Sequence, residues 1–160
     1  MASPLPRSPF PISRLRTKEG KSASPEGREA LYAIFHTECV TSELAWRYLE
    51  RLRRLGEPGG LPVVGVSQDP VNETAEFAKR VGVEAEMLFD APPWPVSSAL
   101  GVTGVPTLLL VDSEGRLVER VEGFQKRKLE DFAARSAELS GRDELPLFRA
   151  DENVPASRPG

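Results

Sequence analysis

The feature that most constrains the fold is an alternation of short apolar runs with segments of helical pattern. The runs have the length of buried strands, and most are followed by apolar residues at helical spacing. The expected strands cover residues 31–36, 62–67, 87–89, 106–112 and 116–121, and the expected helices cover 41–55, 70–81, 96–100 and 126–139. Strands that alternate with helices form a sheet covered on both faces. The sequence therefore predicts an α/β protein.

We expect a single folded domain flanked by two less ordered ends of the chain. A chain of 160 residues can bury a substantial core. Residues 1–9 are proline-rich and are interpreted as a flexible arm. From Phe10, apolar and polar residues alternate up to a glycine turn at 19–21, which predicts a small N-terminal β-hairpin. Residues 141–160 are interpreted as an extended tail, mobile beyond 151, which Leu145–Phe148 could anchor on the core.

Composition and charge exclude several classes of partner. The formal net charge of -3 gives no reason to expect nucleic acid or an anionic membrane. No apolar run approaches the roughly 20 residues of a membrane span. The N-terminus lacks the continuous apolar stretch of a secretory signal. A single cysteine allows no intramolecular disulfide, so we expect a reducing, cytoplasmic compartment.

Cys39, the only cysteine, falls between the strand 31–36 and the helix 41–55. Backbone N–H groups and the helix dipole stabilise a thiolate at such a junction. The flanking carboxylates of Glu38 and Glu43 oppose this effect. A lone cysteine is most often a buried small apolar residue, but the junction favours a reactive thiol over that interpretation.

Two tetrapeptides carry a family resemblance: Cys39-Val40-Thr41-Ser42 and Gly104-Val105-Pro106-Thr107. Their order and spacing resemble the redoxin branch of the thioredoxin-like superfamily, which includes bacterial thiol–disulfide oxidoreductases and thiol-specific antioxidant proteins. In that superfamily a C-x-x-C motif faces a cis-proline. The resemblance covers about residues 10–140. It implies a thioredoxin-like fold, with a central mixed sheet, helices on both faces and the N-terminal hairpin.

The resemblance also implies which residues bind substrate. Val105, Pro106 and Thr107 would bind an extended substrate segment through the backbone beside a cis bond at Pro106. Trp94 lies in the proline-rich loop before this segment. It either lines the same groove or packs on the surface.

Ser42 stands where the superfamily has its second cysteine. A serine hydroxyl cannot attack a mixed disulfide, so Cys39 is left with a monothiol mode in which glutathione or another external thiol completes turnover. Ser42 either donates a hydrogen bond to the Cys39 thiolate or caps the helix together with Thr41. The buried carboxylate that thioredoxins carry behind the cysteine pair is missing from Tyr32–Phe35.

Two other functions stay open. One is a redox-inactive module that binds peptides or acts as an adaptor. The other is a peroxiredoxin-like peroxidase, disfavoured because His36 stands where peroxiredoxins carry threonine. We interpret His36 as a strand-end histidine whose ring faces solvent, in preference to a partner of the thiolate.

No metal or cofactor is expected, because one cysteine and one histidine cannot supply a set of soft metal ligands. The expected partners are protein or low-molecular-weight thiols and disulfides. The sequence leaves the oligomeric state open.

Overall fold

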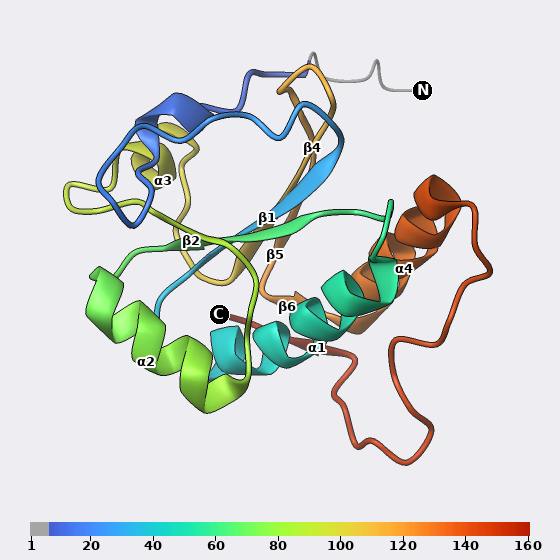
Figure 1. The fold of residues 1–160 in the computed structure, drawn as a ribbon. Coiled ribbons are helices and arrows are strands. Elements are labelled where there is room, and N and C mark those ends of the chain that lie inside the picture. The colour runs from blue at the N-terminus through green and yellow to red at the C-terminus, as the bar shows by residue number, and fades with distance from the viewer. Residues whose placement is uncertain (1–6) are drawn as a thin grey trace, which may run out of the picture.

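A five-stranded mixed sheet forms the centre of the molecule (Figure 1), as seen in a computed structural model that describes residues 7–160. The strand order is β3-β2-β1-β4-β5. The strands are β1 Ala30–Phe35, β2 Val63–Ser67, β3 Met87–Phe89, β4 Thr107–Val111 and β5 Leu117–Glu122. β1 pairs in parallel with β2 and antiparallel with β4. Because β1 is central and covered on both faces, all six of its residues are buried.

Side chains of β1 alternate between two apolar layers. Leu31, Ala33 and Phe35 face the first layer, which α1 Val40–Gly56, α2 Val71–Val81 and α4 Lys126–Ser140 cover. Tyr32 and Ile34 face the second layer, beneath the short helices η1 Ile12–Arg14 and α3 Pro95–Ala99. This alternation follows from the two-residue period of a strand. The predicted mixed α/β sheet with helices on both faces is confirmed.

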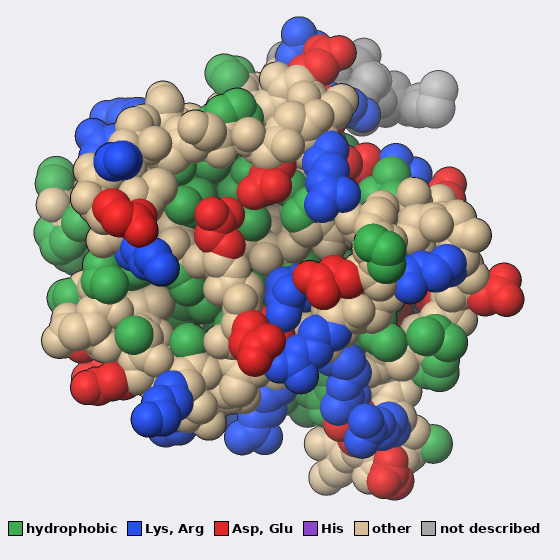
Figure 2. All heavy atoms as spheres, viewed as in Figure 1, with side chains coloured by type: hydrophobic (Ala, Val, Ile, Leu, Met, Phe, Trp, Pro, Cys, Tyr) green, Lys and Arg blue, Asp and Glu red, His purple; other side chains and the backbone are tan. Residues whose placement is uncertain are grey.

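Charged side chains follow α1 across the face shown in Figure 2, where blue and red groups are interleaved. Glu50 is the buried member of this set, and it accepts hydrogen bonds from Arg53 at 2.6 Å and Arg54 at 2.8 Å. Burial acts to raise the pKa of Glu50, but the bonds from Arg53 outweigh it and the pKa lies below its ordinary value. Glu50 also accepts from the Ala85 N–H at 3.2 Å, which ties α1 to the segment before β3.

The N-terminal segment forms a shorter hairpin than expected, confined to residues 15–23 around the predicted glycine turn. Pro9 and Pro11 have no N–H to give to a strand ladder, and residues 12–14 form the 3₁₀ turn η1 instead. Beyond η1 the short hairpin follows: Arg16 bridges Ser22 antiparallel, and the Ala23 N–H donates to the Leu15 carbonyl at 2.9 Å. A second bridge joins Arg16 to Phe89. Phe10 and Leu15 are buried in the second layer, so burial of these two side chains determines the path of the segment.

Both ends of the chain differ from the flexible arm and the mobile tail expected from the sequence. Residues 1–6 of the expected arm lie outside the described residues. Ser8 of the same arm is bound to β5, because its carbonyl accepts from the Leu117 N–H at 2.7 Å. The C-terminal tail returns across α1, and its strand β7 Ser157–Arg158 pairs antiparallel with β6 Phe124–Gln125. The C-terminal end therefore lies beside the start of α1 (Figure 1).

Among the helices of residues 7–160, none combines the length and the apolar character that crossing a membrane requires.

Candidate thiol site

Cys39 is the N-cap residue of α1. Its backbone is extended, with φ -90° and ψ 117°, and its carbonyl accepts the first helical bond from the Glu43 N–H at 3.0 Å. The Ser42 N–H donates to the Cys39 Sγ at 3.4 Å. A serine, threonine or aspartate oxygen usually accepts this bond at an N-cap, so here the sulfur takes that place. The half-buried sulfur thus faces the positive end of the α1 dipole.

The loop between β1 and Cys39 is held from two sides. The Asp69 carboxylate accepts from the Thr37 N–H at 2.7 Å, and the His36 carbonyl accepts from the Cys39 N–H at 3.3 Å. Of the two carboxylates expected to oppose a thiolate, Glu38 is exposed. Glu43 forms an ion pair with Arg80 of α2 at 3.1 Å. This pairing reduces the field of Glu43 at the sulfur.

The Val105–Pro106 segment lies opposite the sulfur. Its peptide bond is cis, and the Cys39 S–H donates to the Val105 carbonyl at 3.4 Å. Thr107 is buried at the start of β4, and its hydroxyl donates to the Gly104 carbonyl at 2.7 Å. The Pro106 carbonyl accepts from the Gly123 N–H at 2.8 Å, which ties the segment to the end of β5. The structure therefore brings together Cys39 and the Val105–Thr107 segment, although Cys39 and Val105 are 66 residues apart in the sequence.

An open hollow of about 320 Å³ lies between these two segments. Its lining residues are His36, Cys39, Gln68, Val102, Thr103, Gly104, Val105 and Gly160. His36 was expected to turn its ring to solvent, and the structure makes it part of the hollow that contains Cys39. Sequence reasoning did not select Gln68, which follows β2 and enters the hollow because β2 lies next to β1.

Ser42 is fully buried behind Cys39, with 0% of its surface exposed. Its hydroxyl has no hydrogen-bond partner within residues 7–160. The hydroxyl therefore neither donates a hydrogen bond to Cys39 nor caps the helix, the two roles expected from the sequence. The backbone N–H of Ser42, not its hydroxyl, contacts the sulfur, and the cap is Cys39 itself. The hydroxyl of Thr41 donates instead to the Pro159 carbonyl at 2.8 Å.

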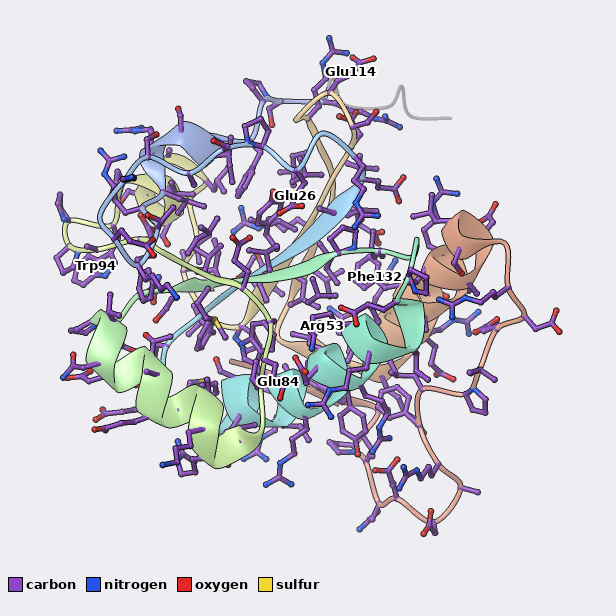
Figure 3. All side chains as sticks on the ribbon, viewed as in Figure 1. Glu26, Arg53, Glu84, Trp94, Glu114 and Phe132 are labelled. Atoms are coloured by element: carbon purple, nitrogen blue, oxygen red, sulfur yellow. The ribbon has the colours of Figure 1, made fainter. Side chains whose placement is uncertain are left out.

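Trp94 lies at the edge of the molecule, on the loop before α3 (Figure 3), and 44% of its surface is exposed. Its backbone has a positive φ of 53°, and its indole N–H donates to the Gln68 carbonyl at 3.4 Å. Trp94 is not among the residues that line the hollow. Its indole bond reaches the backbone of Gln68, a residue that lines the hollow, and its exposure agrees with the surface-packing alternative.

The C-terminal tail is the part of the site that sequence reasoning missed. Gly160 lines the hollow with Cys39, and Pro159 contacts Thr41 at the first turn of α1. The apolar Leu145–Phe148 was the one signal in the sequence, and it does anchor the tail: Leu147 is buried, and the Phe148 ring lies 4.5 Å from that of Tyr48. The last residues carry no pattern that would have shown where they lie.

Comparisons with known proteins agree with this geometry. The chain is 23% identical over 120 residues to the thiol-disulfide oxidoreductase ResA of Geobacillus thermodenitrificans (strain NG80-2), covering 74% of this chain and 68% of that protein. It is similar in structure to a thiol:disulfide interchange protein of the thioredoxin family from Chlorobium tepidum TLS, with a TM-score of 0.67, 18% identity and coverage of 87% and 100%. A thioredoxin-like protein from Porphyromonas gingivalis gives a TM-score of 0.66, 20% identity and coverage of 82% and 92%. No family model matches the chain.

Proposed function

We propose that this thioredoxin-like chain is a monothiol protein of thiol–disulfide exchange, with Cys39 as its nucleophile. The observation that carries the proposal is the position of the Cys39 sulfur. It is half-buried at the N-terminus of α1, receives the Ser42 N–H, and lies 3.4 Å from the Val105 carbonyl. A thiolate is favoured at such a helix start, and a partly exposed sulfur can be reached by the disulfide of a substrate.

The exchange has three steps. The Cys39 thiolate attacks one sulfur of a disulfide, a new bond to Cys39 forms, and the other sulfur leaves as a thiolate that takes a proton from water. An external thiol, as its thiolate, then attacks the Cys39 sulfur of this mixed disulfide and releases the second substrate sulfur as a thiolate. A second external thiolate attacks the new disulfide on Cys39 and frees the Cys39 thiolate, so the two external thiols supply the two electrons and end joined in one disulfide. Ser42 has no sulfur to perform the second step, so the mixed disulfide persists until that thiol arrives.

Val105, Pro106 and Thr107 are proposed to hold the substrate backbone during the first step. Thr107 fixes the turn through its bond to Gly104, and the Val105 carbonyl faces the sulfur. An extended segment laid along this backbone would bring its own sulfur to Cys39. We place this chemistry in a reducing, cytoplasmic compartment, because an external thiol is present there in excess.

The alternative function is an adaptor that binds a peptide at the same backbone without chemistry. Two observations favour it: Ser42 replaces the resolving thiol, and the Cys39 S–H donates to a carbonyl, a contact that a thiolate would lose. The two functions differ in whether Cys39 reacts at neutral pH.

Incubation with 2,2′-dithiodipyridine, followed by intact mass, tests the proposal. We expect an adduct on the wild-type chain at pH 7 that forms faster than the adduct of free glutathione, and none on Cys39→Ser. The adduct should disappear when excess glutathione is added. If the wild-type chain forms no adduct while free glutathione reacts, the monothiol mechanism is wrong and the adaptor function replaces it.

A further inference from the structure

The last five residues of the chain, 156–160, cross the groove in which a substrate backbone would bind. Figure 1 shows the C-terminal end lying between the start of α1 and β6. Lys126 N–H donates to the Ala156 carbonyl at 2.9 Å, and Ser157–Arg158 pairs with β6. The Pro159 carbonyl then accepts from the Thr41 hydroxyl, two residues beyond Cys39.

The segment 156–160 fits the groove closely. A Cβ atom on Gly160 would overlap the carbonyl of Val105, so the backbone of this glycine lies directly on the proposed substrate platform. A Cβ on Gly123 would come within 2.7 Å of the Arg158 carbonyl. Glycine at both positions therefore allows two backbones to approach more closely than side chains permit.

A strong anchor holds the segment at this place. Glu152 accepts two hydrogen bonds from Arg51 of α1, at 2.7 and 3.0 Å, and one from the Tyr48 hydroxyl at 3.2 Å. Leu147 and Phe148 pack on the same part of α1. The anchor lies only a few residues before the groove, so the tether gives the segment a high effective concentration there.

We propose that the segment 156–160 is a built-in competitor that occupies the peptide groove beside Cys39 and must leave before an extended polypeptide can bind. The inference rests on the proposed function, because it concerns the same site. The segment occupies the place that such a substrate would need: its strand with β6 leads Gly160 onto the backbone of Val105, where the substrate backbone would bind. A small disulfide needs neither contact and reaches Cys39 through the hollow beside it.

The expected effect is selective for the size of the disulfide. If the segment leaves the groove for about 1–10% of the time, its removal speeds the reaction with a polypeptide about tenfold to a hundredfold. The reaction with a small disulfide changes little, because Cys39 keeps its place at the start of α1. Two activated disulfides with the same leaving group separate these effects: 2,2′-dithiodipyridine and a short unstructured peptide whose cysteine carries a 2-thiopyridyl disulfide.

The rates of thiopyridone release are compared for the full chain, a variant lacking residues 156–160, and Gly160→Val, whose side chain cannot fit against Val105. Ala150→Val is the control, because it adds bulk to the tail at an exposed position between Phe148 and Glu152, outside the segment 156–160. We expect the first two variants to raise the peptide rate relative to the small-disulfide rate, and the control to leave the ratio unchanged. An unchanged ratio in both variants overturns the inference. A chain whose Cys39 reacts with neither probe, with or without the segment, overturns the proposed function instead.

Discussion

At the scale of single residues, the Cys39 sulfur lies between the Ser42 N–H and the Val105 carbonyl, and the sequence brought both residues into consideration. Cys39 and Val105 were selected from a strand-to-helix junction and a Val-Pro-Thr segment, and the structure places sulfur and carbonyl 3.4 Å apart. The bond from the Ser42 N–H could not be predicted, because it depends on the sulfur being the cap. Spacing specifies residue types and positions, whereas a hydrogen bond depends on the direction of each side chain.

Ser42→Cys tests the assignment of Ser42 as the missing resolving residue. Ser42 is buried one turn into α1 behind Cys39, so a cysteine there would stand where the second thiol of a C-x-x-C pair stands. We expect the variant to form an intramolecular disulfide and to reduce insulin, measured by turbidity, faster than the slow wild type. The absence of a buried carboxylate in Tyr32–Phe35 should keep this rate below that of an ordinary thioredoxin.

Ser42→Ala is the matched control for that substitution. It removes a buried hydroxyl without a partner in the described chain, so unfolding free energy should rise by up to about 1 kcal/mol while insulin reduction stays slow. If Ser42→Cys forms no disulfide under an oxidant that couples other C-x-x-C pairs, Ser42 does not occupy the resolving position.

At the scale of elements, the sheet and its main helices were predictable and the ends were not. Continuous apolar runs identify β1 and β2 because both faces of these strands are covered. The turn at Gly115 identified the β4–β5 hairpin, because its φ of 81° suits glycine. The tail was predicted as mobile beyond 151, yet Glu152 and β7 join it to α1 and β6. The hydrogen bonds of the tail join residues far apart in the sequence, so no local sequence pattern predicts them.

The anchor of the tail predicts a dependence on pH. Hydrogen bonds from Arg51 lower the pKa of Glu152 to about 2, from an ordinary value of 4.5. The unfolded chain therefore binds this proton more readily than the folded chain does. The stabilisation by Glu152 is complete above about pH 4.5 and is lost as the pH falls towards 2.

Urea unfolding of the wild type and of Glu152→Gln between pH 6 and pH 2.5 measures this loss. The wild type should be the more stable at pH 6, and the difference should narrow as the solution becomes acidic. Glu144→Gln, at an exposed position, serves as the control. Its stability to urea should differ little from that of the wild type at every pH in this range. A difference between wild type and Glu152→Gln that stays constant over this range would contradict the assignment of the ion pair.

At the scale of the whole molecule, the tail is part of the first apolar layer. Leu147 is 3% exposed and packs in that layer, whereas Leu145 is 57% exposed. Leu147→Ala should lower the unfolding free energy by about 2–3 kcal/mol, because it leaves a cavity in the core. Leu145→Ala should change it by less than about 0.5 kcal/mol. Chemical denaturation compares the two, and equal losses would show that the tail does not pack as described.

The position of the tail has a consequence for two copies of the chain. Each copy carries one sulfur able to form a disulfide, so oxidation can join two copies only through Cys39 of both. The residues 156–160 of each copy lie beside that sulfur and would stand between the approaching surfaces. If the proposed competitor occupies the groove, we expect mild oxidants to join two copies through Cys39 more slowly in the full chain than in the variant lacking residues 156–160. The segment proposed to delay a polypeptide substrate would then also keep Cys39 reduced.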